Sequence, residues 1–348
     1  MEKIRAAFPG YKLLITFFSP SGYEIRKKYS GADYVFYLPI DSRNNAAEFL
    51  DLVNPSLAVF IKYEYWYHYL IEIKKRKINC LLVSAIFRKG QSFFKSHGSL
   101  QRRMLHCFTQ IFVQNKESKE LLDTIDIRSV IVSGDTRFDS VIEVVEKFDP
   151  IPLIEKFVNN VKCIVAGSTW NADEEALQKA LRGLGEIKLI IAPHEIHESH
   201  LADLKKLFPR SIRFSDLGTA TEHIKDNILI IDNIGMLSRL YKYAFIAYVG
   251  GGFTRDGVHN VLEAAVYGKP VVFGKNYKKY REAADLVEYN GAISFSNPGE
   301  LFQLFTALLN DEDGYSQVCQ ASMNYVWKNK GATEKILDYI VENRLLTS

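Results

Sequence analysis

The sequence predicts an α/β protein built of two Rossmann-like domains, and three observations support that prediction. Apolar strand-like runs alternate with amphipathic stretches from end to end, which is typical of parallel sheets with crossover helices. The runs fall into two series separated by residues 148–152, where each of two prolines disfavours helix at the residue before it. The 348 residues suffice for two domains that each bury a core.

The strand-like runs are short, and amphipathic stretches such as residues 44–53 and 66–77 between them predict helices. The first series comprises residues 12–18, 34–38, 57–61, 80–85, 111–114 and 129–132. The second comprises residues 162–166, 188–192, 228–231, 245–249, 270–273 and 292–295. We therefore expect an N-terminal domain over residues 1–147 and a C-terminal domain over residues 148–330. Residues 331–348 are expected to form a last helix that packs back across the domain boundary.

Composition argues against several classes of protein. With 44 basic and 41 acidic side chains the net charge is +3, so nothing points to a nucleic-acid partner. The four cysteines are scattered without a CxxC pair, so we expect a cytoplasmic protein with no metal and no cofactor. No apolar run approaches the roughly 18 residues that span a bilayer. Basic runs such as residues 74–77 are typical of solvated helix ends, and contact with an anionic membrane surface is the alternative.

The start of the chain departs from a doubly wound domain, which normally opens with a strand. Residues 2–8 have the pattern of the last turns of a helix that Pro9 and Gly10 end, and no strand precedes them. Two explanations stay open at this point. Either the helix simply begins the chain, or one β-α unit is missing from it.

Residues 248–274 give the strongest indication of a binding site. A strand ends near residue 249, and Gly250, Gly251 and Gly252 follow it. Backbone without side chains at the carboxyl end of a strand lets a phosphate group approach closely. The alternative is that these glycines only serve a tight turn between strand and helix.

His259, Asn260 and Glu263 follow at the start of a helix that we expect to end at Gly268. Asn is a favoured helix cap, and a Glu three residues later fits a capping box, so structural roles compete with binding for these two side chains. His259 has polar and glycine neighbours, which argue against a core position.

Ser168 and Thr169 lie where another strand passes into a helix. Hydroxyl and backbone N–H groups at such a place can hold an anion, and helix capping is the alternative. His194 lies at a third strand end, where a structural role is the alternative.

Two charged side chains in the first half are further candidates. Arg137 follows the strand-like run that ends at residue 132, and its alternative role is a salt bridge with Asp135 or Asp139. Glu64 follows the run 57–61, at the sheet edge where parallel strands end. The aromatic residues around it either form an apolar wall for a bound acceptor or pack in the core.

Five ordered motifs resemble those of one family. They are SPSGYE at residues 19–24, EYW at 64–66, SGDTRFD at 133–139, AGST at 166–169, and GGG, HNxxExA and GKP within 250–270. The set resembles the Kdo transferases, in which the first four segments appear as TPTGxE, ELW, TGNLKFD and AGSTH. These glycosyltransferases attach 3-deoxy-D-manno-octulosonic acid (Kdo) to a lipid A precursor in lipopolysaccharide biosynthesis.

The resemblance implies a GT-B fold, with two Rossmann-like domains that face an interdomain cleft. It also implies a C-terminal site for the donor CMP-Kdo, in which Glu263 accepts hydrogen bonds from the ribose hydroxyls. Arg137 would neutralise the departing phosphate, and Glu64 would support the catalytic site from the acceptor side. The donor-binding residues are Ser168, Thr169, His194, Gly250, Gly251, Gly252, His259, Asn260 and Glu263. The acceptor would be a lipid A precursor, with peripheral contact at the cytoplasmic face of the bacterial inner membrane.

Two departures from the family pattern limit the expected activity. The family's general-base Glu lies in an SxGE segment that has no match in this sequence, and Pro193 stands before His194 where the family has Arg. General-base help is worth about 10²–10⁴-fold, so we expect donor binding with poor turnover. The alternatives are a GT-B enzyme that uses a UDP-sugar, as a transferase or an epimerase, and a non-catalytic nucleotide-sugar-binding protein. A nicotinamide dehydrogenase is disfavoured, because no GxGxxG follows an early strand.

Overall fold

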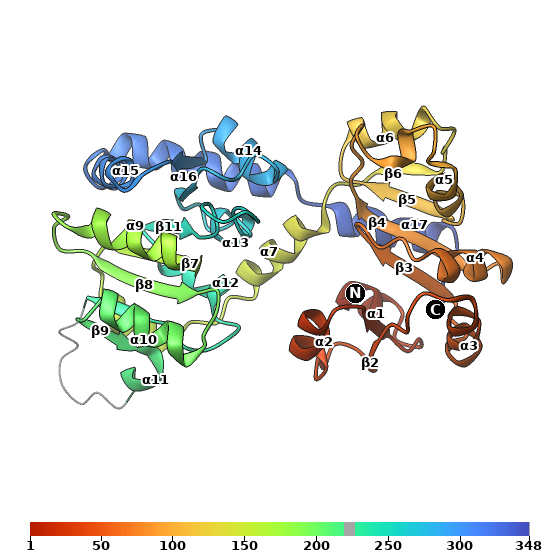
Figure 1. Cartoon of the computed structure of the whole chain (residues 1–348), viewed down its shortest axis with the longest axis horizontal. Helices are drawn as coiled ribbons and strands as arrows, with labels where there is room; N and C mark the ends of the chain where they lie inside the picture. Colours follow the sequence, from red (N-terminus) through yellow and green to blue (C-terminus); the bar gives the residue numbers. More distant parts are fainter. Residues whose placement is uncertain (219–226, 348) are drawn as a thin grey trace. The chain divides into compact units, whose positions relative to one another are not determined.

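A computed structural model describes residues 1–218 and 227–347, and the chain divides into two compact units (Figure 1). Unit 1 comprises Met1–Asp139 together with the chain from Gly331 onward. Unit 2 comprises Ser140–Lys330. The first boundary therefore falls within helix α7 (Thr136–Glu146), upstream of the proline-containing segment.

Unit 1 contains two parallel sheets. One pairs β1 (Leu14–Phe17) with β2 (Tyr34–Tyr37), and the other has the strand order β3-β4-β5-β6. The strands of the second sheet are β3 (Leu57–Ile61), β4 (Asn79–Ala85), β5 (Gln110–Val113) and β6 (Val130–Val132). The helices that begin in this unit are α1 (Glu2–Ala7), α2 (Pro20–Arg26), α3 (Arg43–Val53), α4 (Tyr67–Lys75), α5 (Ser99–Leu105), α6 (Lys116–Asp123), α7 and α17 (Ala332–Glu342), with a short 3-10 turn η1 (Ser92–Phe94).

The central strands of unit 1 are buried on both faces, which is why they appear in the sequence as continuous apolar runs. β4 is buried along almost its whole length. The last helix of the chain completes one face of this core, because Ile336 and Ile340 of α17 pack in a cluster with Phe8, Leu81 and Phe112. The Asp139 carboxylate accepts hydrogen bonds from the backbone N–H groups of Gly331 and Thr333, each at 2.7 Å, and so fixes the start of α17.

Unit 2 contains a single seven-stranded parallel sheet of order β13-β12-β11-β7-β8-β10-β9. The strands are β7 (Cys163–Thr169), β8 (Lys188–Pro193), β9 (Ser211–Arg213), β10 (Ile228–Ile230), β11 (Ile246–Val249), β12 (Val271–Gly274) and β13 (Ala292–Phe295). The helices are α8 (Pro152–Val158), α9 (Asn171–Leu181), α10 (Glu198–Leu207), α11 (Phe214–Leu217), α12 (Leu237–Leu240), α13 (Leu262–Ala265), α14 (Arg281–Glu288), α15 (Pro298–Asn310) and α16 (Glu312–Lys328), with the 3-10 turn η2 (Tyr241–Tyr243).

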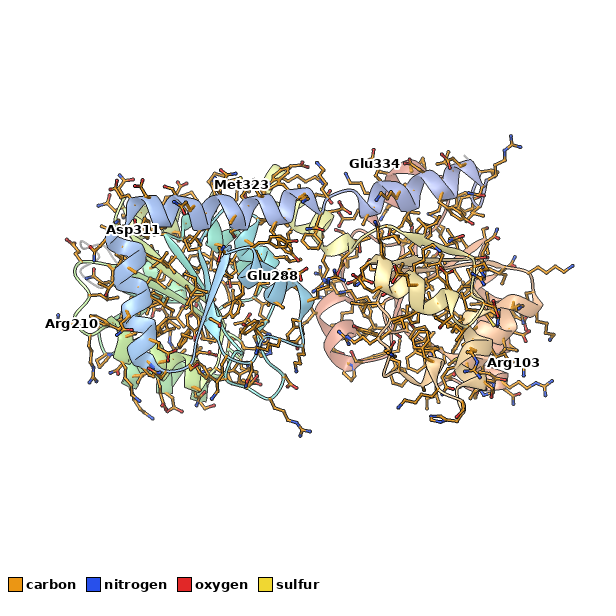
Figure 2. The ribbon with its side chains drawn as sticks, turned by 90° about the horizontal axis from the view of Figure 1, so that it is seen from above. Arg103, Arg210, Glu288, Asp311, Met323 and Glu334 are labelled. Atoms are coloured by element: carbon orange, nitrogen blue, oxygen red, sulfur yellow. The ribbon has the colours of Figure 1, made fainter. Side chains whose placement is uncertain are left out.

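Helix α16 runs along unit 2 with Met323 near its middle (Figure 2). Helix α16 packs closely against the turn at Gly268, because a Cβ atom at Gly268 would lie 2.7 Å from the Met323 Cε atom. The Ser322 hydroxyl donates to the Ala265 carbonyl at the end of α13, at 3.4 Å. Helix α16 therefore supports the short helix that carries Glu263.

The predicted α/β architecture of two Rossmann-like domains is confirmed. A strand overlaps each of the twelve predicted apolar runs, although several strands begin or end outside the predicted bounds. One further strand, β9, was not predicted, because its three residues alternate polar and apolar side chains and are too short to give a pattern.

Candidate functional site

The candidate site lies at the carboxyl ends of β7 and β11, which are neighbours in the sheet of unit 2. Their register pairs Val249 with Gly167, and the Gly250 N–H donates to the Gly167 carbonyl at 2.8 Å. The loop after β11 and the start of α9 after β7 therefore emerge side by side. This is the edge of a parallel sheet where open α/β folds bind their ligands.

The glycines are required by the packing of the chain itself. A Cβ atom at Gly250 would lie 2.2 Å from the Ser168 carbonyl oxygen, and one at Gly252 would lie 2.4 Å from the Gly274 nitrogen. Gly251 has a φ of +88°, which residues with a side chain rarely adopt. The tight-turn role is thus observed, and it leaves this backbone bare whatever the segment binds.

A buried carboxylate holds the glycine loop against α9. Asp173 accepts hydrogen bonds from the Gly251 N–H at 2.9 Å, the Tyr248 hydroxyl at 2.7 Å and the Trp170 N–H at 3.0 Å. The carboxylate is fully buried; burial raises its pKa, and the three hydrogen bonds partly offset that rise. Sequence reasoning missed Asp173, because its partners Tyr248 and Gly251 reach it only when β7 and β11 pair.

The hydroxyls of Ser168 and Thr169 are held differently. Thr169 is buried, and its hydroxyl donates to a Glu174 carboxylate oxygen at 2.9 Å. That carboxylate also contacts the His200 Nε2 atom at 3.0 Å. Ser168 is half-buried, has a φ of +54° and lies at a break in the register between β7 and β8. Neither residue caps α9, whose N-cap is Trp170, so the capping alternative is wrong for both.

Three aromatic rings form a platform beside the glycine loop. The Trp170 indole N–H donates to the His259 Nε2 atom at 3.0 Å. The His194 ring stacks on both of them, with centroid distances of 4.7 Å to Trp170 and 4.4 Å to His259. The structure thus brings together two predicted donor-site histidines, and it adds a tryptophan that sequence reasoning missed. We call Trp170, His194 and His259 the ring platform.

His259 is neutral in this setting. Burial, followed by the nearby His194, lowers its pKa from 6.5 to about 4, and Asp256 opposes the shift. An indole N–H is only a donor, so the Nε2 atom of His259 must accept and the ring hydrogen is on Nδ1.

Asn260 and Glu263 are joined to each other. The Asn260 amide donates to a Glu263 carboxylate oxygen at 2.8 Å, and burial raises the pKa of that carboxyl. The Asn260 Oδ1 atom also accepts from the backbone N–H of Leu262, the first residue of α13, at 3.3 Å, so the capping alternative has support. The expected helix end at Gly268 is wrong, because α13 ends at Ala265 and the chain continues in tight turns to Gly268, whose φ is +63°. The Glu263 side chain also makes no capping box.

Arg137 and Glu64 belong to unit 1. Two guanidinium nitrogens of Arg137 contact the buried Asp135 carboxylate, at 2.9 and 2.8 Å, so the predicted alternative of a salt bridge is observed. The Lys62 ammonium also lies 3.7 Å from Asp135. Glu64 is exposed and accepts a hydrogen bond from the Trp66 indole at 2.5 Å.

Within residues 1–218 and 227–347, no group of His, Cys, Asp or Glu side chains is arranged to hold a metal ion. In the same residues, no helix is both long enough and apolar enough to cross a bilayer.

Comparison with known proteins supports the resemblance in both halves. Residues 1–140 match the family model described as 3-deoxy-D-manno-octulosonic-acid transferase. A 3-deoxy-D-manno-octulosonic acid transferase of Aquifex aeolicus is 29% identical over 310 residues, which cover 86% of this chain and 79% of that protein. One of Haemophilus influenzae is 23% identical over 358 residues, with 98% and 82% covered. This chain is similar to Kdo transferases over most of its length.

A longer relative shares the same region. The bifunctional glycosyltransferase/methyltransferase of Fusobacterium nucleatum is 27% identical over 349 residues. The match covers 96% of the Kdo transferase-like chain but only 51% of the relative, so the chain spans about half of that protein's length.

Solved structures show the fold of the Kdo transferase-like chain. A UDP-GlcNAc 2-epimerase of Neisseria meningitidis superposes with a TM-score of 0.68 at 16% identity, covering 99% of this chain and 96% of that one. A glycosyltransferase of Rickettsia africae gives 0.58 at 15% identity, covering 98% and 93%. Such likeness identifies the GT-B type of fold and carries no substrate with it.

Replacing His259 by Gln is expected to flatten the loss of stability in acid. The folded-state pKa of about 4 lies below the ordinary value of 6.5, so the unfolded chain binds more protons between these two values. The stability that the neutral ring contributes is therefore complete above pH 6.5 and lost as the pH falls towards 4. Thermal unfolding midpoints of wild type and His259→Gln, compared near neutral pH and near pH 4 to 5, measure the difference.

The matched control is His197→Gln, because His197 is exposed in the same unit and its side chain makes no cap hydrogen bond. This control should lose as much stability in acid as the wild type does. An equal acid loss in the wild type and His259→Gln would contradict the assignment of the low pKa to His259.

Proposed function

We propose that this chain binds CMP-Kdo through unit 2 and transfers Kdo to a lipid A precursor in lipopolysaccharide biosynthesis. The observation that carries the proposal is the bare Gly250–Gly252 backbone, held by Asp173 between the ring platform and the Ser168 segment. Relatives named Kdo transferases align with most of the chain, which supports the choice of donor.

The phosphate of the donor would bind where β7 passes into α9. Helix α9 has eleven residues, and its first N–H groups provide the partial positive charge that attracts an anion. The Ser168 hydroxyl lies at this passage, whereas the Thr169 hydroxyl is occupied by Glu174. We therefore assign a direct side-chain contact with phosphate to Ser168 and a positioning role to Thr169.

The ribose would bind at Glu263. Asn260 occupies one carboxylate oxygen of Glu263, so the other oxygen is available to accept from the ribose hydroxyls. Asn260 then orients the carboxylate, and the burial that raises the pKa of Glu263 also strengthens its hydrogen bonds. His194 and His259 would contact the donor from the ring platform.

In the proposed reaction, a positively charged side chain stabilises the departing phosphate, and no metal ion is required. An acceptor hydroxyl would attack the anomeric carbon of Kdo while the C–O bond to the phosphate breaks, through an oxocarbenium-like state, and CMP leaves. Asp135 fixes the guanidinium of Arg137, and a preorganised cation is what stabilises charge that develops on a leaving group. We propose that Arg137 takes this role and that Glu64 supports the acceptor.

Glu263→Gln is expected to weaken CMP binding by roughly ten- to a hundredfold, because hydrogen bonds to a charged acceptor contribute about 1.5–3 kcal/mol. Calorimetry with CMP and UMP on both proteins measures this, and wild type should prefer CMP. Glu175→Gln is the matched control, because Glu175 is exposed in the same unit. Absence of CMP binding to wild type at millimolar ligand would contradict the proposal.

A preference for UMP over CMP would favour the second candidate, a GT-B enzyme that uses a UDP-sugar. Binding without any transfer would favour the non-catalytic alternative.

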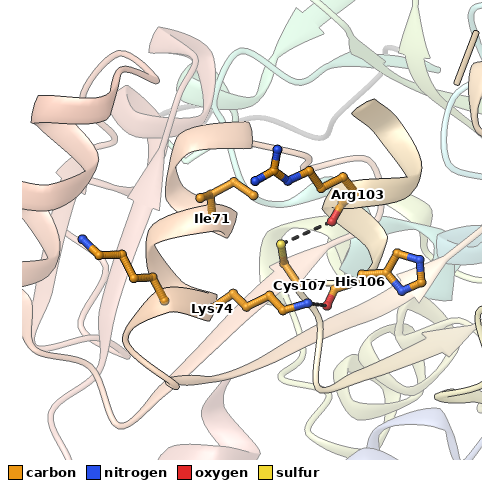
Figure 3. Close-up of a pocket in the computed structure, with 6 residues that line it drawn as sticks. Ile71, Lys74, Arg103, His106 and Cys107 are labelled. Carbon is orange, nitrogen blue, oxygen red and sulfur yellow. Dashed lines mark hydrogen bonds between the residues drawn. The ribbon is translucent and has the colours of Figure 1, made fainter. Parts of the chain in front are cut away.

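We also propose peripheral contact between unit 1 and an anionic membrane surface at the cytoplasmic face of the inner membrane. Lys74 and Lys75 of α4, Arg103 of α5 and His106 line one pocket, and Figure 3 labels Lys74, Arg103 and His106. The Lys74 ammonium donates to the His106 carbonyl at 2.8 Å and ties the two helix ends together. The half-exposed Leu100 on α5 adds an apolar side chain.

Reversing two of these charges, with Lys75→Glu and Arg103→Glu together, is expected to reduce binding to anionic vesicles by about tenfold or more, since each basic residue near such a surface contributes about 1 kcal/mol. Co-sedimentation with vesicles that contain phosphatidylglycerol measures the change. The control reverses Lys156 and Lys179, two exposed lysines of unit 2. Equal loss in both double variants would show a general charge effect and no specific surface.

A further inference from the structure

The ring platform contains one polar contact that the proposed function does not explain. Trp170 follows Thr169 directly at the end of β7, and its backbone N–H is held by Asp173 at 3.0 Å. Its half-buried indole reaches across to the loop after β11, where the indole N–H donates to the His259 Nε2 atom at 3.0 Å. This hydrogen bond joins the chain after β7 to the loop after β11, in addition to the contact between Asp173 and Gly251.

This hydrogen bond decides which nitrogen of His259 carries the hydrogen. Indole offers a donor and no acceptor, so His259 must accept at Nε2 and carry its hydrogen on Nδ1. Among the residues that the structure describes, the Nδ1–H group of His259 has no partner. A half-buried donor of this kind, in a wall of the site, is suited to a ligand oxygen.

The stacking geometry keeps the pair in place. The His194 ring lies at 18° to the His259 ring and at 30° to the Trp170 ring, so it covers both members of the hydrogen-bonded pair. The backbone opposite is equally confined, because a Cβ atom at Gly251 would lie 2.8 Å from the His259 Cδ2 atom. His259 therefore has little freedom to turn over and exchange its nitrogens.

We propose that Trp170 is a positioning residue that fixes His259 as an Nδ1–H donor towards an acceptor oxygen of the bound nucleotide. This inference rests on the proposed binding of CMP in unit 2. The ring platform then contributes a neutral, directional donor, which complements the backbone N–H groups that serve the phosphate. Protonation of His259 would place a hydrogen on Nε2, facing the indole N–H, so the arrangement also disfavours the charged ring.

The tautomer of His259 tests the proposal without any variant. Long-range ¹⁵N–¹H NMR spectra of the full chain, with the His259 signals assigned by their loss in His259→Asn, show which ring nitrogen carries the hydrogen. We expect a predominantly Nδ1-protonated ring near pH 7. A ring protonated on Nε2 would overturn the proposal.

Trp170→Phe keeps an aromatic ring for the stack and removes the donor. We expect this variant to shift His259 towards Nε2 protonation and to weaken CMP binding by about two- to tenfold, the equivalent of one neutral hydrogen bond. Trp327→Phe is the matched control, because Trp327 lies on α16 and should change neither readout. An unchanged tautomer, or an unchanged CMP affinity with a changed tautomer, would overturn the proposal.

A wrong assignment of the nucleotide would give a different result from a wrong assignment of the role of Trp170. If wild type bound no CMP while His259 showed the expected tautomer and its change in Trp170→Phe, the role of Trp170 in positioning His259 would stand. The nucleotide would then be the wrong ligand.

Discussion

The buried carboxylate of Asp173 is the interaction on which the candidate site depends. It receives a hydrogen bond from the Gly251 N–H, one from the Tyr248 hydroxyl and one from the Trp170 N–H, and these groups come from two adjacent strand ends. Burying a carboxylate costs free energy unless hydrogen-bond donors surround it. The three donors therefore fix the position of the Asp173 carboxylate, and the carboxylate fixes the positions of the three donors. The glycine loop keeps its open backbone because this carboxylate holds one end of it.

The remaining parts of the site follow from that attachment. Once Trp170 is fixed by its backbone, its indole reaches His259, and His194 stacks over both rings. The glycines that follow β11 permit close packing against Ser168 and Gly274, where any side chain would collide. On the far side of the loop, Asn260 orients Glu263. The site is therefore a set of pre-positioned polar groups around bare backbone, an arrangement suited to binding a nucleotide.

The periodicity of apolar residues was sufficient to predict the fold. The order of the motifs was sufficient to predict most residues of the candidate site. Each predicted apolar run overlaps a strand, because buried parallel strands are continuous apolar segments and need no tertiary information to be recognised. The pairwise contacts could not be predicted in this way. Nothing in the sequence pattern distinguishes an Asp173 that binds Gly251 from one that faces solvent, since the two are brought together only when β7 and β11 pair.

The predictions for single side chains were incomplete for a more local reason. Asn260 was a candidate for helix capping or for ligand binding, and in the structure its Oδ1 atom accepts from the Leu262 N–H while its amide N–H donates to Glu263. Thr169 was expected to offer its hydroxyl, but Glu174 takes it. For Arg137 the simpler alternative, a salt bridge with Asp135, is what the structure contains. In each of these cases a partner within five residues along the chain holds the side chain.

Amide hydrogen exchange of Gly251 tests the central role of Asp173 most directly. In wild type the Gly251 amide should be protected, because it donates to a buried carboxylate. In Asp173→Ala that protection should fall sharply, while the amides in the middle of β7 and β11 stay protected and CMP affinity falls with it. An equally protected Gly251 amide and unchanged CMP affinity in Asp173→Ala would contradict the account.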